Sequence, residues 1–179
     1  EHSIEQLKAT ILKLAVLGKL VPQDSNDESA SELLKKIAKE KELLIKNKAI
    51  KKQKMLSDIT EKEKTFHLPN GWEWVRFGDI YELVYGNNLP KPKRTESGEF
   101  NVYGSNGIVG THNEACVTSP CIVIGRKGSA GALNKSTQDG CWVTDVAYSL
   151  SPFANMNLDF IFYQLHTCGL DSLGKGIKP

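Results

Sequence analysis

The sequence predicts an α+β protein in which a long helical pair precedes a globular β-rich domain with short helices. Three observations indicate this fold class. Apolar residues recur at three- and four-residue steps in residues 1–65, whereas short β-branched runs alternate with glycine, serine and asparagine turns in residues 103–150. Between them, Pro69-Asn70-Gly71 marks a change of pattern. We therefore expect a helical region over residues 1–65 and a globular domain over residues 66–179.

The first helix is predicted from a regular repeat of apolar residues. Ser3 and Gln6 have the spacing of a capping box at its start, and Gly18 is placed to end it in the left-handed conformation. The repeat forms an apolar stripe, which we predict to be an interface with another helix. The residues of this stripe are Ile4, Leu7, Ile11 and Leu14.

A second, longer helix is expected to begin after Ser29, which forms another capping box with Glu32. No proline or glycine interrupts residues 29–66, so the helix is expected to reach Met55 or Leu56. About 27 residues at about 1.5 Å each would span about 40 Å. Its partner could be the first helix, in a coiled-coil arrangement, another copy or another protein. Its predicted interface residues are Leu33, Ile37 and Leu44.

The net charge of +2 is unevenly distributed. Residues 1–65 hold 14 lysines against 11 acidic residues, or +3, and residues 66–179 hold 9 basic against 10 acidic residues, or −1. Nine of the lysines lie in residues 34–54. This basic helix could meet an anionic partner, and a solvated helix face would give the same pattern.

The globular domain is expected to begin with two strands, Trp72–Val75 and Tyr81–Tyr85, joined by a turn at Phe77–Ile80. Residues 86–99 lack apolar periodicity and contain two prolines, which predicts a long loop. Such loops are often functional, although a solvated loop without a function stays possible. Its cations are Lys91, Lys93 and Arg94.

A compact apolar run at residues 121–124 predicts a buried strand that leads into a glycine-rich turn. The strand ends at Arg126 and Lys127, and glycines at positions 125, 128 and 131 let backbone N–H groups approach a ligand. Two cations and several amide donors could therefore face one anion, such as a phosphate. Glycines that only reverse the chain direction would give the same pattern. Further on, Asn157 is expected to cap a short amphipathic helix, residues 158–165, that lies across the sheet.

The sequence lacks the motifs of several kinds of catalytic, nucleotide-binding and metal-binding site. The stretch GALNKS lacks the glycines of a P-loop, the serine of GSAG is not in a GxSxG elbow, and no GxGxxG is present. The histidines form no metal-binding pair, and Asp145 has no partner for general acid–base catalysis. The four cysteines are expected to be reduced and mostly buried. No segment has the character of a membrane span or a signal peptide, so a cytoplasmic protein is expected.

Several segments resemble the specificity (S) subunit of type I restriction-modification enzymes. They are SIEQLKATILKLAVLGKLVPQDSNDESASELLKKIAKEKELL, LPNGWEWVRFGDI, VYGSNGIVGT, IVIGRKGSAG and CWVTDVAYSL. The order of GKLVPQD and LPNGWEW is the most specific part of the likeness. The resemblance implies two target-recognition domains, each reading one half of a bipartite DNA site, and conserved helices that pack as an antiparallel coiled coil.

The resemblance also implies the division of labour between subunits. The chain itself would be no enzyme and would carry no cofactor, while S-adenosylmethionine, ATP and Mg²⁺ would belong to the modification (methyltransferase) and restriction (endonuclease and translocase) subunits. Residues 1–65 would be the conserved helical spacer. Residues 66–179 would be one target-recognition domain, expected to be incomplete at its carboxyl end. The partners of the chain would be double-stranded DNA, both other subunits and, through the helices, a second copy.

The DNA-contacting residues are predicted from charge and loop position, because cations can hold phosphates while polar side chains reach base edges. They are Lys91, Lys93, Arg94, Tyr103, Ser105, Asn106, Arg126, Lys127, Ser129, Lys135 and Lys175. The predicted function is DNA sequence recognition within a type I restriction-modification system. The alternative is a helical dimerisation fragment that does not read DNA.

Overall fold

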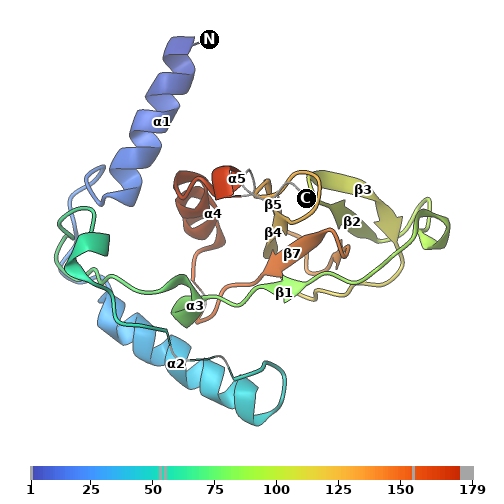
Figure 1. Cartoon of the computed structure of the whole chain (residues 1–179), viewed down its shortest axis with the longest axis horizontal. Coiled ribbons are helices and arrows are strands. Elements are labelled where there is room, and N and C mark those ends of the chain that lie inside the picture. The colour runs from blue at the N-terminus through green and yellow to red at the C-terminus, as the bar shows by residue number, and fades with distance from the viewer. Residues whose placement is uncertain (1, 53, 55, 155, 174–179) are drawn as a thin grey trace. The chain divides into compact units, whose positions relative to one another are not determined.

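The structure is a computed structural model that describes residues 2–52, 54, 56–154 and 156–173. It contains helices and sheets, as the predicted α+β class requires, and is formed by two compact units. Unit 1 consists of Glu1–Tyr81 and Phe153–Asn155, and unit 2 consists of Glu82–Pro152 and Met156–Pro179. Figure 1 shows the elements of both.

Unit 1 begins with helix α1, His2–Val16. Gly18 ends it in the left-handed conformation with a φ of +65°. The amides of Gly18 and Lys19 donate to the carbonyls of Ala15 and Leu14 at 3.0 and 2.8 Å, which closes the last turn as predicted. The predicted capping box at the start is wrong, because Ser3 lies inside the helix.

Helix α2, Ala30–Lys46, begins as predicted, with the Ser29 side chain accepting from the Glu32 amide at 3.4 Å. It ends about nine residues earlier than the predicted Met55, since Lys48 takes a left-handed φ of 58° and the chain turns back (Figure 1). Its 17 residues span about 25 Å instead of 40 Å. Lysines replace the apolar stripe beyond Ile45, and propensity alone does not extend a helix without packing.

A short helix that follows in unit 1 packs on α2. Ile37 is buried, and Lys41 donates from Nζ to the carbonyls of Gly78 and Asp79 at 2.8 and 3.1 Å, which holds the short helix α3, Phe77–Ile80. The predicted strand Trp72–Val75 is wrong, because this segment pairs with no strand among the described residues.

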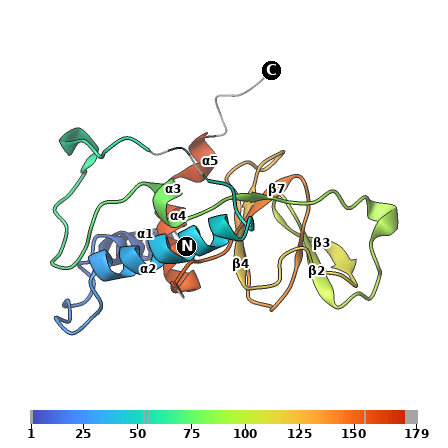
Figure 2. The same ribbon diagram turned by 90° about the horizontal axis from the view of Figure 1, so that it is seen from below.

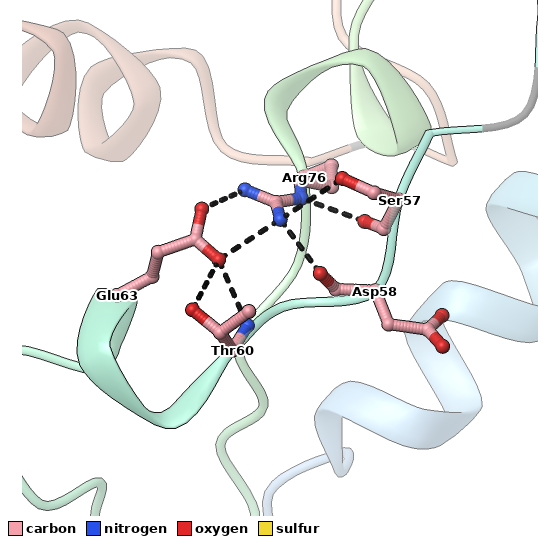
Figure 3. Close-up of polar contacts among 5 residues, drawn as sticks. All are labelled: Ser57, Asp58, Thr60, Glu63 and Arg76. Atoms are coloured by element: carbon pink, nitrogen blue, oxygen red, sulfur yellow. Dashed lines mark hydrogen bonds and ion pairs between the residues drawn. The ribbon is translucent and has the colours of Figure 1, made fainter.

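An arginine ties the segment after α2 to the start of α3 (Figure 3). Both Arg76 Nη atoms donate to the Glu63 carboxylate, at 2.5 and 3.1 Å, while Nε and Nη2 donate to the carbonyls of Ser57 and Asp58 at 2.9 and 2.8 Å. Glu63, in the single turn η1 (Glu61–Glu63), also accepts from the amide and hydroxyl of Thr60. The Arg76 guanidinium and the two Thr60 donors lower the pKa of Glu63 to about 2.

Unit 2 contains two sheets. The four-stranded sheet has the order β1 (Val84–Tyr85), β7 (Ala147–Leu150), β4 (Cys121–Gly125) and β5 (Leu133–Ser136), with all pairs antiparallel. The three-stranded sheet has the order β3 (Gly107–His112), β2 (Phe100–Gly104) and β6 (Trp142–Val143), where β2 and β6 are parallel. The strand predicted over Tyr81–Tyr85 is thus reduced to its last two residues.

The core of unit 2 lies between these sheets. Val123 and Ala147 of the four-stranded sheet meet Tyr103 and Val143 of the other, and all four side chains are buried. All of β4 is buried, as predicted from its apolar run. The core therefore fixes where the turns at the strand ends emerge.

Helix α4, Leu158–Thr167, packs on β4 and β5 and buries Ile161 and Leu165. The Asn157 side chain caps it as predicted, accepting from the Phe160 amide at 2.9 Å. A short helix α5, Leu170–Leu173, follows. No described helix has the length and apolar character needed to cross a membrane.

Candidate nucleic-acid interface

Two glycine turns of unit 2 touch each other. A Cβ built on Gly125 would lie 2.3 Å from the carbonyl oxygen of Ser105 and 2.1 Å from that of Ser129. Only glycine therefore fits where the turn after β4 (residues 125–131) meets the turn between β2 and β3 (residues 104–107). The contact brings Ser105 and the exposed Asn106 beside the chain that carries Arg126, Lys127 and Ser129.

The turn after β4 presents one fixed and one free cationic side chain. The amides of Arg126 and Lys127 both donate to the Val146 carbonyl, at 2.9 and 3.1 Å. Arg126 is half-buried, and its Nη2 donates to the Asp145 carbonyl at 2.5 Å, whereas Lys127 is exposed. Asp145 therefore contacts Arg126 through its backbone carbonyl. Gly128 and Gly131 take left-handed φ values of +80° and +82°, whereas Gly125 does not take a positive φ.

Two tyrosines missed by the sequence analysis lie next to Arg126. Tyr85 on β1 and Tyr148 on β7 are directly paired, with ring centroids 4.8 Å apart. The Arg126 guanidinium lies 5.3 Å from the Tyr85 centroid and 6.0 Å from that of Tyr148. A side-chain hydrogen bond with Tyr85, together with burial, raises the pKa of the Tyr148 hydroxyl.

The predicted loop over residues 86–99 is confirmed, with one short helix, η2 (Lys91–Lys93), inside it. It runs on the β3 side of unit 2, away from α4, in both views (Figures 1 and 2). Arg94 fixes the loop to β3, because its Nη1 donates to the Val109 carbonyl at 2.9 Å. Its Nε donates to the Leu89 carbonyl, within the loop, at 3.3 Å. Lys91 and Lys93 are exposed.

The other predicted DNA contacts lie elsewhere. Tyr103 is 6% exposed and belongs to the core between the sheets, so it offers no surface for DNA. The Lys135 ammonium is paired with the Asp159 carboxylate of α4 and lies 5.6 Å from the Phe162 centroid. Lys175 lies outside the described residues. The structure thus groups Ser105, Asn106, Arg126, Lys127 and Ser129, but does not bring Tyr103 or Lys135 to that surface.

Helix α1 leaves its apolar stripe in solvent within unit 1. Ile4 and Leu7 are 58% and 59% exposed, and Ile11 and Leu14 are 44% and 36% exposed. In α2, Leu33 and Leu44 are half-buried, while Ile37 is 1% exposed and belongs to the core of unit 1. The stripe of α1 is therefore the predicted interface that stays accessible, and Ile37 is not free to contact another subunit.

No group of three or more histidine, cysteine, aspartate or glutamate side chains capable of holding a metal occurs in the described part of the chain. All four cysteines are free thiols, as predicted, but Cys168 is exposed. Cys121 and Cys141 are fully buried with their Sγ atoms 3.7 Å apart. The hydrogen bond between the two thiols, together with burial, raises the pKa of Cys121.

Part of the chain is closely similar to two curated proteins. It is 62% identical over 86 residues to the "Type I restriction enzyme EcoAI specificity subunit" of Escherichia coli, and 60% identical over 80 residues to the EcoEI specificity subunit of the same organism. These matches cover 48% and 45% of this chain, but only 15% and 14% of the two relatives. They confirm the resemblance to specificity subunits, while no protein-family model matches the chain.

Three solved structures of restriction-modification proteins align with this chain. One, from a study of complex assembly and conformational transition of the type I restriction-modification system, aligns over 98% of this chain and 42% of its own, with a TM-score of 0.50 and 16% identity. The S subunit of M. genitalium and the HsdS subunit of Thermoanaerobacter tengcongensis both align at a TM-score of 0.49 and 18% identity. They cover 60% and 82% of this chain and 30% and 38% of theirs. At 16% identity the likeness to the first of these structures concerns the fold alone.

Proposed function

We propose that this chain is part of a type I restriction enzyme specificity subunit, in which unit 2 reads one half of a bipartite DNA site. The identity of 60% or more to two named specificity subunits supports this assignment. Because the chain spans about one seventh of each relative, the reading of DNA and the binding of other subunits are proposed for it here.

The contact between the two glycine turns is the structural observation that carries the proposal. It places an exposed ammonium, Lys127, beside the polar side chains of Ser105 and Asn106 on one surface of unit 2. In protein–DNA interfaces, cations hold phosphates and set the register, while polar side chains and backbone groups read base edges. The two turns supply both the cation and the polar groups, and their backbones are in close contact at Gly125.

The role proposed for unit 1 is to position unit 2 and to bind partner subunits. The exposed stripe of α1 would pair with another helix in a coiled-coil arrangement, because four apolar side chains at three- and four-residue steps need such a partner to leave water. Helix α2 spans only about 25 Å, so it cannot by itself separate two reading domains by the 34 Å of one DNA turn. Additional helical length would have to come from the partner.

No catalytic role is proposed for the chain. Methylation would be carried out by a modification subunit that holds S-adenosylmethionine, and cleavage by a restriction subunit that uses ATP and Mg²⁺. The specificity subunit would bring both to the DNA. This division agrees with the absence of the catalytic motifs sought in the sequence.

The proposal is tested by fluorescence anisotropy of the purified chain with a labelled pool of random-sequence duplexes about three helical turns long. The chain is expected to bind, and Lys127→Ala is expected to reduce the slope of log affinity against log salt by about one unit. Lys62→Ala, which removes an exposed lysine of unit 1, is the matched control. Absence of duplex binding at low salt would refute the function.

A second function, dimerisation through the helices without DNA reading, is favoured by one observation, the exposed stripe of α1. Sedimentation velocity separates the two. A dimer that is dissociated by Leu7→Glu, in a chain that binds no duplex, would support the second function over the first.

A further inference from the structure

The face of the four-stranded sheet that points away from the core is only partly covered. Side chains alternate along a strand, so Ile122, Ile124 and Arg126 lie on one side of β4 and its extension, and Cys121 and Val123 lie on the core side. The register places Tyr148 opposite Ile124, and Tyr85 opposite Tyr148, on this same outer face.

Helix α4 covers one end of this outer face. Lys135 lies opposite Ile122 and is paired with Asp159 of α4, so the helix sits over that end. At the other end lie Tyr85, Tyr148 and Arg126, which we name the tyrosine–arginine face. Tyr85 is 63% exposed although it belongs to a strand, and β1 is at the edge of the sheet.

The tyrosine–arginine face is held in a fixed conformation. Arg126 is anchored by its hydrogen bond to the Asp145 carbonyl, and its Nε is buried and has no hydrogen-bond partner among the described residues. The guanidinium in turn lies against both rings, which restrains them. An exposed aromatic ring with few remaining rotamers loses little conformational entropy on binding, which favours its use as a contact residue.

The chemistry of this face suits a nucleotide. A tyrosine ring can pack against a base or a deoxyribose, and cations beside it can face the phosphates. The turn after β4 supplies two charged side chains here, and both are cationic, namely Arg126 and Lys127. Ser105 and Asn106 meet the same turn from the core side of the sheet, at Gly125, so the two surfaces adjoin only through the residues of this turn.

We propose that Tyr85 is a DNA-contacting residue, whose ring, supported by Tyr148 and Arg126, packs against a base or deoxyribose of duplex DNA. Arg126 serves as a positioning residue for the ring, and Lys127 faces a neighbouring phosphate. The inference rests on the proposed function and extends its surface onto the outer face of the four-stranded sheet.

Three variants of the full chain test the inference in the same anisotropy assay. Tyr85→Ala is expected to weaken duplex binding about tenfold, towards the low end of what the loss of one base–aromatic contact costs in single-stranded complexes. Tyr85→Phe is expected to bind as the wild type does, because the ring is retained. Tyr163→Ala, which removes another exposed tyrosine of unit 2 on α4, is the matched control and is expected to change nothing.

Photocrosslinking gives a readout that does not depend on affinity or folding of a variant. The wild-type chain is irradiated with a random-sequence duplex in which 5-iododeoxyuridine replaces thymidine, and the adduct is located by mass spectrometry of the digested protein. An adduct on the peptide that contains Tyr85 is expected.

The outcomes separate the inference from the proposed function. If the wild type binds duplex but Tyr85→Ala binds equally well and no adduct forms at Tyr85, the inference alone is overturned. If Tyr85→Ala instead weakens only the association with a methyltransferase subunit, the face binds protein and the inference is likewise overturned. If the wild type binds no duplex, the proposed function fails and the inference fails with it.

Discussion

Gly125→Ala is the sharpest test of the contact between the two glycine turns. The added Cβ would lie 2.1 Å from the carbonyl oxygen of Ser129 and 2.3 Å from that of Ser105, while ordinary contacts of this kind are 3.4 Å or longer. Both obstacles are backbone atoms, and no side chain can rotate away. The turn after β4 must therefore open between Gly125 and Ser129, and the two turns must separate, by about 1 Å each. Overpacking usually costs about 1–3 kcal/mol, and we expect about 3 kcal/mol or more where backbone has to move.

Gly128→Ala is the matched control from the same turn. Its Cβ would meet only the Ser105 hydroxyl oxygen at 3.7 Å, an ordinary distance, so its cost comes from the φ of +80° alone. A left-handed alanine costs about 1–2 kcal/mol. Gly125→Ala should therefore be the more damaging of two substitutions that add the same methyl group.

Hydrogen–deuterium exchange followed by mass spectrometry measures the effect within unit 2. Peptides from β4 and β5 should exchange much faster in Gly125→Ala than in Gly128→Ala, and duplex affinity should fall along with this protection. Equal protection of β4 in Gly125→Ala and the wild type would show that the turns do not touch as described.

Three other predictions follow from named contacts. Arg76 lowers the pKa of Glu63 to about 2, so the ion pair between these two residues should be intact above about pH 4.5 and lost as the pH falls towards 2. The Glu63 carboxyl signal in NMR follows this titration. A midpoint near pH 4.5 would argue against the ion pair. Brief alkylation of the native chain should modify the exposed Cys168 well before the buried Cys121, and mass spectrometry giving equal rates would contradict the burial of β4. Asn157→Ala should cost about 1 kcal/mol through loss of the α4 cap, measured by urea denaturation, whereas Asn157→Ser should cost less; equal losses would exclude capping as the cause.

Local sequence signals predicted the elements that depend on local chemistry. The apolar run at residues 121–124 is a buried strand, Gly18 ends α1, and Ser29 and Asn157 cap their helices, because each outcome is decided by residues within a few positions. The length of α2 was wrong for a related reason. Lack of proline and glycine permits a helix but does not stabilise one, and packing ends near Ile45.

Features that depend on distant contacts were missed. The alternation of Trp72 and Trp74 suggested a strand, but no strand of the described chain pairs with this segment, and Trp72 Nε1 donates to the Gln23 side chain instead. The pairing of Tyr85 with Tyr148 joins residues far apart in sequence, and neither position carries a pattern that reveals the other. Lys135 was predicted to contact DNA from its charge alone. Its partner Asp159 is distant in the sequence and is brought near only by the packing of α4.

The close fit at Gly125 limits how the recognition surface can be altered. Residues 104–107 and 125–131 share a backbone contact, so lengthening either segment displaces the other. An engineer who wishes to give this unit a new target sequence should graft both segments from a single donor, together with the glycine between them. Exchanging one alone would alter the shape of the surface before it altered the bases that are read.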